Sequence, residues 1–384
     1  MSGNILISKG NIEEWEDACF THNQAIGIAD GVGGWSNYGM SSADFSNELM
    51  KRCEKLCIKV LQIRKFTSNL IKSSEFKLKL SDYKWPISEQ VKCGRFHAHS
   101  FWYTEEGENE FPLKNLLEES EVYQDDNDNL SFELGKQNQS VPLDPLLIIE
   151  EAYKYIKSFG SSTICVCTLE ENKLKVANLG DSGMILLRYN QEEQESKVIS
   201  CTQDQQHEFN APYQLAKIPK DIQEKINAKR NNIDLSEEKS QPTLFWEDPP
   251  ESADTYEINV RAKDIAILGT DGLFDNLFLD DILDIVDMYM RSLLKSKEKK
   301  IKSSSKNICF DKLSNDMSFT EKEAQVLAWK LGKAAKTKSR SMRTISPFEQ
   351  KYNKFMEDKK EEEVDHIWQG GKSDDIGVVV SFII

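Results

Sequence analysis

Acidic residues recur where short apolar runs begin or end. Asp30 follows IGIA, Asp181 follows VANLG, Asp271 follows IAILGT, and Asp374 with Asp375 precedes IGVVVSF. An Asp-Gly pair by itself is typical of a turn and needs no chemistry. If the apolar runs are strands of packed sheets, however, their ends share a rim, and carboxylates gathered there repel each other unless a cation neutralises them. The recurrence therefore predicts a cation site.

The type of ligand predicts which cation this site would take. Carboxylates without a neighbouring cluster of His and Cys favour hard cations, so Mg²⁺ or Mn²⁺ suits the site better than Zn²⁺. Two such ions, about 3.5 to 4 Å apart, can hold a water molecule and lower its pKa until hydroxide attacks phosphorus in line. The acidic residues thus predict hydrolysis of phosphate esters. A structural Ca²⁺ site is the alternative, although the chain contains no EF-hand loop pattern.

Apolar runs of strand length border the acidic positions. Their β-branched or alternating residues, bounded by glycine and polar turns, predict strands over residues 24–30, 162–169, 173–179, 184–189, 264–269 and 376–384. Gly180 to Gly183 is the expected turn between two of them. The strands that flank the acids would have to meet at one rim for the cation site to form.

Helical periodicity predicts the layers that cover these strands. Ser41, with Asp44 three residues later, is a capping-box-like start to a long amphipathic helix. Asp144 and Pro145 suit the cap and the first position of a second helix, which is expected to run to about Ser158. Apolar spacing within residues 282–289 and 324–331 predicts two further helices.

The chain reads as one domain over residues 1–384 with two polar interruptions. From about residue 67 to 143 the periodicity weakens and acidic residues crowd together, which predicts an acidic insertion on a core that resumes afterwards. A protein partner could bind through this insertion. A lysine- and serine-rich stretch at about 295–320, densest from Lys295 to Lys306, is expected to be a solvated loop.

Charge and termini exclude several classes of protein. The 384 residues include 49 Lys and Arg against 64 Asp and Glu, so the net charge is −15, and a surface this acidic disfavours a nucleic-acid partner. No run approaches the roughly 18 to 20 apolar residues that a membrane span needs. The N-terminus shows no signal peptide or Arg-rich presequence, and Ser2 excludes myristoylation. The sequence therefore predicts a cytoplasmic protein with reduced thiols.

Six motifs in chain order resemble the metal-dependent protein serine/threonine phosphatases of the protein phosphatase 2C type. They are WEDACF with Glu16 and Asp17, ADGVGGW with Asp30 and Gly31, GSST from Gly160, GDSG with Asp181, TDGLFDN with Asp271 and Asp275, and the Asp374-Asp375 pair. Finer strings resemble the branch of mitochondrial phosphatases linked to coenzyme Q biosynthesis: ADGVGGW, QQHEFNAPYQL, TDGLFDN, SPF and GGKSDDI. The ordered set covers most of the chain outside the insertion.

The resemblance implies a fold and an activity. The expected fold is α+β, a four-layer α-β-β-α sandwich in which two antiparallel sheets pack face to face with helices outside. The expected activity is Mg²⁺- or Mn²⁺-dependent hydrolysis of phosphoserine and phosphothreonine in a phosphoprotein substrate, by direct attack of a water that bridges two ions. Asp30, Asp271 and Asp374 would be the catalytic carboxylates. The branch also implies a mitochondrial location, which the N-terminus does not show.

The resemblance also assigns roles to the remaining acids. Asp30 would bridge both ions, the Gly31 carbonyl would bind one of them, and Asp271 with Asp374 would complete the other. The other expected metal ligands, direct or through water, are Glu16 and Asp17, with Asp181 and Asp275 for a weaker third ion. Asp375 stands where many relatives have Asn, so we expect it to orient other groups.

Two departures from the family pattern leave other functions open. Val32 stands where many members have a histidine proposed as the general acid, and Ile12 stands where many have a phosphate-binding arginine. The branch that this chain resembles also lacks the histidine, so activity is not excluded. The alternatives are a catalytically weak or inactive scaffold that binds partners, and a phosphatase of small phosphorylated metabolites.

Other residues that could carry chemistry have simpler interpretations. Cys93, His97 and His99 could hold zinc, but no fourth ligand is evident and an ordinary loop is favoured. Cys165 and Cys167 alternate with apolar residues, which predicts burial in a sheet rather than reactivity.

Three ring side chains near the motifs also invite a functional interpretation. His207 is expected to form a structural hydrogen bond rather than to act in catalysis. Trp15 and Trp35 flank the first two acidic motifs. They could line a metal cleft, and core packing explains them equally well.

Overall fold

The computed structural model describes residues 2–7, 15–72, 142–224, 246–304, 318–359 and 367–384. Contacts divide the chain into a compact unit of residues 1–61 and 143–384 and a second unit of residues 62–142. The expected acidic insertion lies outside the described residues except at its ends, and so does the Cys93 group. None of the helices within the described ranges has the length and apolar content of a membrane span.

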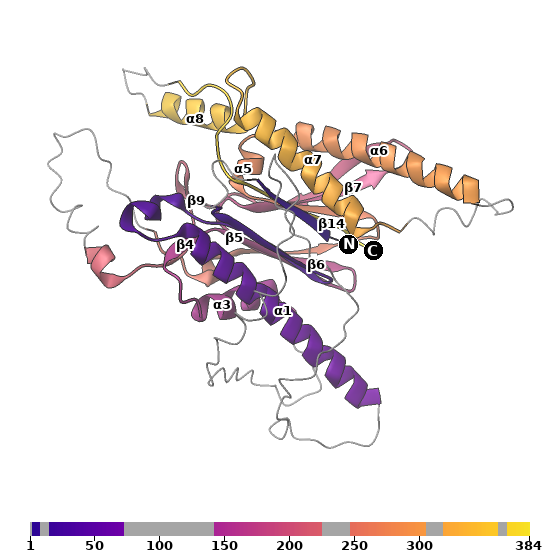
Figure 1. The fold of residues 1–384 in the computed structure, drawn as a ribbon, viewed down its shortest axis with the longest axis horizontal. Helices are drawn as coiled ribbons and strands as arrows, with labels where there is room; N and C mark the ends of the chain where they lie inside the picture. Colours follow the sequence, from indigo (N-terminus) through magenta and orange to yellow (C-terminus); the bar gives the residue numbers. More distant parts are fainter. Residues whose placement is uncertain (1, 8–14, 73–141, 225–245, 305–317, 360–366) are drawn as a thin grey trace, which may run out of the picture. The chain divides into compact units, whose positions relative to one another are not determined.

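Two five-stranded antiparallel sheets form the centre of the compact unit (Figure 1). The first has the order β1 (Ser2–Ile7), β14 (Ile376–Phe382), β13 (Asp264–Gly269), β7 (Gly183–Asn190) and β8 (Glu195–Cys201). The second has the order β12 (Asp254–Asn259), β6 (Lys173–Leu179), β5 (Ile164–Glu170), β3 (Ala25–Asp30) and β2 (Asp17–His22). Two short pairs join β4 (Gly160–Ser162) to β11 (Leu215–Lys217) and β9 (Gln206–Glu208) to β10 (Ala211–Pro212).

Helices cover the outer faces of both sheets, as Figure 1 shows. On one side lie α1 (Ser42–Lys72) and α3 (Pro145–Lys154), and on the other α6 (Leu279–Ser304) and α7 (Glu321–Ser339). The remaining helical elements are η1 (Gly33–Tyr38), η4 (Pro250–Ser252), α5 (Asp271–Phe274) and α8 (Pro347–Asp358). The expected α+β sandwich of four layers is therefore confirmed.

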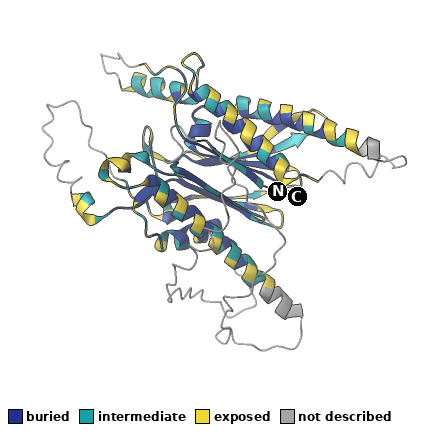
Figure 2. Ribbon diagram, in the orientation of Figure 1, coloured by how far each residue is buried: buried dark blue, intermediate teal, exposed yellow. Residues whose placement is uncertain are grey.

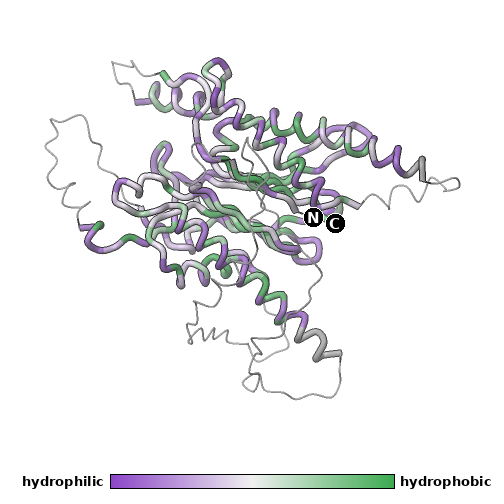
Figure 3. The backbone as a smooth tube through the Cα atoms, in the orientation of Figure 1, coloured by the Kyte–Doolittle hydropathy of each residue, from purple (hydrophilic) through white to green (hydrophobic). Residues whose placement is uncertain are grey.

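Apolar side chains fill the space between the layers. Ile28, Val176, Leu268 and Val379 belong to a buried cluster between the two sheets, and a second cluster joins the first sheet to α6 and α7. Figure 2 shows the strands as the most buried part of the unit, and Figure 3 shows hydrophobic residues concentrated along the same strands. Two packed sheets hold their strand ends in fixed positions, which is what a site at a rim requires.

Capping residues fix several helix ends where the sequence predicts them. The carboxylate of Asp144 accepts hydrogen bonds from the backbone N–H groups of Leu146 and Leu147, and the hydroxyl of Ser41 accepts one from Asp44. The second predicted helix is shorter than expected, because α3 ends at Lys154 rather than near Ser158.

The expectation of a solvated loop from Lys295 is wrong up to Ser304, because these residues continue α6. The side chain of Lys297 is only 14% exposed and pairs with Glu323 at 2.8 Å. The same ammonium donates a hydrogen bond to the Ser318 carbonyl. A lysine-rich sequence is a good helix former, and here the Lys297 ammonium pairs with Glu323 on α7.

Gly272 allows the first turn of α5 to approach the backbone of Asp375 closely. A Cβ at this position would lie 1.8 Å from the Asp375 carbonyl oxygen, so Gly272→Ala should lower the free energy of unfolding by about 2 kcal/mol or more. Urea unfolding measures the change. Gly34→Ala is the matched control, since a Cβ there would meet nothing within 4 Å. Equal stability of the two variants would contradict the close approach.

Candidate active site

The antiparallel topology brings the predicted acids to one rim of the sandwich. In the second sheet, Asp17 at the start of β2 lies opposite Asp30 at the end of β3. In the first sheet, Asp271 follows the end of β13, beside the start of β14, which Asp374 and Asp375 precede. The turn from β6 to β7 crosses between the sheets at this rim and carries Asp181, which is buried. We call Asp17, Asp30, Asp181, Asp271, Asp275, Asp374 and Asp375 the rim carboxylates.

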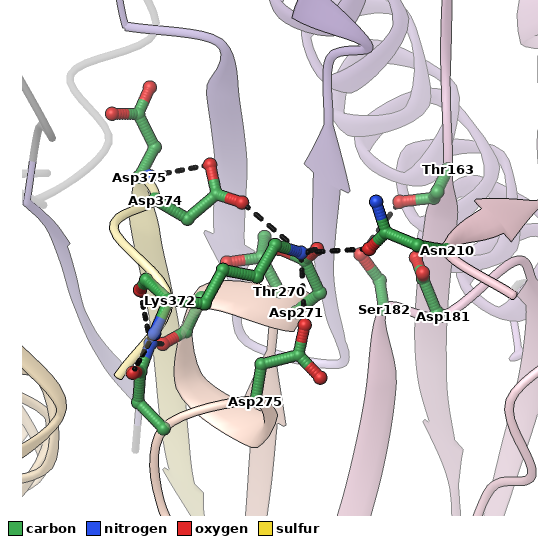
Figure 4. A network of polar contacts seen from close by, with 12 residues as sticks. Thr163, Asp181, Ser182, Asn210, Thr270, Asp271, Asp275, Lys372, Asp374 and Asp375 are labelled. Atoms are coloured by element: carbon green, nitrogen blue, oxygen red, sulfur yellow. Dashed lines mark hydrogen bonds and ion pairs between the residues drawn. The ribbon is translucent and has the colours of Figure 1, made fainter. Parts of the chain in front are cut away.

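A lysine lies in the middle of the rim carboxylates. Figure 4 shows the side chain of Lys372 extending between Asp271, Asp275, Asp374 and Asn210. Its ammonium pairs with Asp271 Oδ2, lies 2.9 Å from Asp275 Oδ2 and lies 3.3 Å from Asp374 Oδ2. It also donates a hydrogen bond of 3.2 Å to Asn210 Oδ1. Only 13% of the lysine side chain is exposed, so this cation is held inside the cluster.

Backbone contacts fix the position of Lys372. The buried side chain of Asn276 accepts a hydrogen bond from the Lys372 N–H at 3.0 Å and donates one to the Lys372 carbonyl at 2.9 Å. The same amide nitrogen donates to the Gly272 carbonyl. Asn276 therefore ties the segment that carries Lys372 and Asp374 to the helix that carries Asp271.

The first acidic motif is tied to the last one. Asp375 is buried, and its Oδ2 accepts a hydrogen bond of 2.9 Å from the backbone N–H of Glu16. The Glu16 carbonyl in turn accepts one from the Gly31 N–H. Asp17 Oδ2 accepts a hydrogen bond of 2.9 Å from the Thr270 hydroxyl. These contacts place Glu16 and Asp17 beside the rim and agree with an orienting role for Asp375.

The acids expected for a third ion, Asp181 and Asp275, are both buried. Asp275 contacts Lys372 and lies 3.7 Å from the ammonium of Lys351. Asp181 accepts a hydrogen bond of 3.2 Å from the side chain of Gln206. Lys351 also pairs with Asp204 at 3.0 Å.

Burial and mutual repulsion disfavour the charged forms of these carboxylates. Loss of water raises the pKa of Asp17 well above its usual value, and Asp375 and Asp374 raise it further. Burial, followed by the charge of Asp17, raises the pKa of Asp30 in the same direction. Burial and Asp271 raise the pKa of Asp181.

Lys372 reduces this repulsion only locally. Burial raises the pKa of Asp275 to about 6, although the charge of Lys372 acts in the opposite direction. Burial alone would lower the pKa of Lys372, but Asp271, Asp275 and Asp374 raise it above its ordinary value. One ammonium among several buried carboxylates leaves the site rich in negative charge, which a divalent cation would neutralise.

The donor set fits Mg²⁺ or Mn²⁺ because it consists of carboxylate oxygens without His or Cys. Asp17 Oδ1 is buried and has no hydrogen-bond partner among the described residues, as expected for an oxygen that binds a cation. Within the described part of the chain, no three His, Cys, Asp or Glu side chains yet converge as closely as a metal requires. Lys372 lies between three of the carboxylates that would have to converge.

Other predicted residues have structural roles. His207 Nε2 lies 2.9 Å from Asp248 Oδ2, and its ring stacks between Tyr213 and Trp246, so the expected structural hydrogen bond is confirmed. Trp35 is buried against Ala216 and Ile218, which favours core packing over a cleft wall.

The cysteines and Val32 also behave as packing residues. Cys165 and Cys167 are fully buried in β5, as predicted. Burial raises the pKa of the Cys167 thiol well above its usual value. Val32, in the place of the family histidine, packs against the Trp35 cluster, and its alkyl side chain has no proton to donate. Ile12 lies outside the described residues.

Several polar residues of the site have no role that the sequence alone predicts. They are Lys372, Asn276, Asn210, Thr270 and Lys351. Lys372 lies within the string GGKSDDI, two residues before Asp374. This short spacing from a predicted metal ligand is the sequence signal that could have indicated its place in the site.

Comparison with known proteins supports the resemblance. No family model matches the chain. The chain is 27% identical over 273 residues to a protein phosphatase PTC7 homolog of Homo sapiens, covering 68% of this chain and 56% of that protein. It is 34% identical over 162 residues to protein phosphatase 2C homolog 7, mitochondrial, of Saccharomyces cerevisiae, covering 40% of this chain and 42% of that protein. The chain thus spans about half the length of these curated relatives.

A solved structure shares the fold. The X-ray structure of the photosystem II phosphatase PBCP superposes with a TM-score of 0.53 at 20% identity, covering 100% of this chain and 98% of that chain. At this identity the likeness concerns the fold alone. Together with the sequence matches, it confirms that the chain is similar to the protein phosphatases of the 2C type, as its ordered motifs indicate.

Proposed function

We propose that this protein is a Mg²⁺- or Mn²⁺-dependent phosphatase of phosphoserine and phosphothreonine in proteins. The observation that carries the proposal is the gathering of acids from distant parts of the chain at one rim, in an environment that disfavours their charge. Carboxylates that repel each other in this way lower stability, so their presence together favours a site that binds cations. The similarity to curated protein phosphatases supports the substrate class.

The rim carboxylates would divide the work of holding the ions. Asp30 lies opposite Asp17, and the charges of Asp17 and Asp271 both raise its pKa, so it is the candidate for a ligand shared by two ions, with the Gly31 carbonyl beside it. Asp271 and Asp374 would hold one ion, Glu16 and Asp17 would contribute directly or through water, and a weaker ion would lie near Asp181 and Asp275. When bound, the ions would supply a water of lowered pKa for in-line attack on phosphorus.

Orienting groups would keep these ligands in place during the reaction. Thr270 holds Asp17 through a hydrogen bond, and Asp375 holds the backbone of Glu16. Such partners restrict the carboxylate rotamers before an ion arrives, which reduces the cost of ordering the site.

One observation favours a second candidate, a partner-binding scaffold with the same fold. Lys372 neutralises part of the cluster with a cation from the chain itself, so an inactive protein could tolerate these acids. Partner binding through the acidic insertion, like the cytoplasmic or mitochondrial location, stays a prediction.

A metal titration separates the two candidates. Mn²⁺ or Mg²⁺ added to the EDTA-treated protein should raise the melting temperature by mass action and should switch on hydrolysis of an aryl phosphate over the same concentration range. A phosphoserine peptide should then be hydrolysed faster than a free phosphosugar. A flat baseline with every metal would favour the scaffold, and preference for the phosphosugar would favour a metabolite phosphatase.

A further inference from the structure

Lys372 is placed where a divalent ion would need to bind. Its ammonium contacts Asp271 and Asp374, the two carboxylates expected to hold one ion, as well as Asp275. Mg²⁺ requires its oxygen ligands at about 2.0 to 2.1 Å in near-octahedral order. An ion bound to the same carboxylates would therefore lie within a few ångströms of the ammonium, where the two positive charges repel each other in a buried setting.

We infer that Lys372 is a tethered cation that competes with the divalent ion for Asp271 and Asp374. The ammonium and the ion cannot occupy these carboxylates at the same time, so binding of the ion displaces the lysine side chain. The inference rests on the proposed function, because it assumes that these carboxylates bind a metal.

The geometry around Lys372 is suited to such an exchange. Asn276 clamps the backbone of Lys372 through two hydrogen bonds, whereas the ammonium ends a flexible four-carbon stem. The side chain can therefore move while the segment that carries Asp374 stays in place. The ammonium lies over the ring of Phe348, 5.1 Å from the ring centre, which gives the cation an aromatic face beside the carboxylates.

The neighbouring lysine lacks this position and offers a matched comparison. Lys351 lies 3.7 Å from Asp275 and 3.0 Å from Asp204, and 47% of its side chain is exposed. It carries the same charge at the edge of the cluster, but its ion pairs among the described residues are with Asp204 and Asp275 and not with Asp271 or Asp374. If the competition takes place at Asp271 and Asp374, removing the charge of Lys372 should change the metal affinity more than removing the charge of Lys351.

The test measures binding of Mn²⁺ alone to the EDTA-treated full chain by titration calorimetry. Lys372→Met keeps the length of the stem and removes the charge, so it should tighten Mn²⁺ binding by about tenfold or more, since the competing state is lost. Lys351→Met should change the affinity by a smaller factor. Equal or weaker binding of Mn²⁺ by Lys372→Met would overturn the inference, because the lysine would then organise the ligands rather than compete for them.

A second measurement uses the unmodified sequence and so does not depend on how the variant folds. Amine acetylation, quantified by mass spectrometry at each lysine, should increase at Lys372 when Mn²⁺ is added and stay constant at the exposed Lys330 on α7. Unchanged labelling of Lys372 at saturating Mn²⁺ would contradict displacement. Absence of any Mn²⁺ binding would instead contradict the proposed function, and the inference would fall with it.

Discussion

Replacing Asp30 by Asn should abolish turnover and at the same time stabilise the protein in the absence of divalent ions. Asp30 is the candidate for the ligand shared by two ions, so we expect its loss to lower kcat/KM by about a thousandfold or more. Its charge is disfavoured by burial and by Asp17 and Asp271, so the neutral amide removes repulsion. The melting temperature of the EDTA-treated variant should therefore rise, by the equivalent of about 1 kcal/mol.

A loss of activity together with a gain of stability distinguishes a functional carboxylate from a structural one. Thermal unfolding with and without Mn²⁺, combined with initial rates on an aryl phosphate, measures both effects on one preparation. Asp254→Asn makes the same chemical change at an exposed position of β12 and should leave both quantities unchanged. A variant that loses both activity and stability in EDTA would show that Asp30 supports the fold, and the metal proposal would lose its strongest ligand.

The central strands could be predicted from sequence because both of their faces are buried. The six predicted strands correspond to β3, β5, β6, β7, β13 and β14, all in the interior of a sheet. Burial on both faces demands nearly continuous apolar residues, as in Asp264–Gly269, where all six residues are buried. Most of the rim acids lie at or next to the ends of these strands, so the rim could be predicted along with them.

The edge strands could not be predicted in the same way. The four edges of the two sheets are β1, β2, β8 and β12, and none of these strands is among those predicted from the sequence. In β12 every residue has some exposure, so its sequence DTYEIN carries little apolar signal. Such a strand is determined by its pairing with a neighbour, in this case β6, and not by its own burial.

Lys372 illustrates why the site itself was only partly predictable. A lysine between glycine and serine reads as a solvated loop residue, since lysine is almost never buried unless it is paired. Its partners Asp271 and Asp275 lie about a hundred residues earlier in the chain, and only the antiparallel pairing of β13 with β14 brings them together. Sequence spacing can indicate that acids gather, but the identity of the cation among them depends on tertiary contacts.

The stability of the EDTA-treated protein should fall as the pH rises from 5 to 8. Asp17, Asp30 and Asp181 have pKa values well above the ordinary 3.8, and the pKa of Asp275 is raised to about 6. In this range the folded protein holds protons that the unfolded chain has released. The resulting stabilisation is complete below about pH 3.8 and is lost as the pH passes through the raised values.

The size of this pH effect on stability, and its reversal by Mn²⁺, make it diagnostic of the carboxylate cluster. Asp275 alone should contribute about 1 kcal/mol between pH 5 and pH 8, and the other three carboxylates should add to it. Urea unfolding at the two pH values measures the difference. Saturating Mn²⁺ binds the charged carboxylates, so it should stabilise the protein more at pH 8 than at pH 5 and flatten the profile. A protein in EDTA that becomes more stable towards pH 8 would contradict the raised pKa values, because carboxylates that are favourably paired in the folded state gain stability as they ionise.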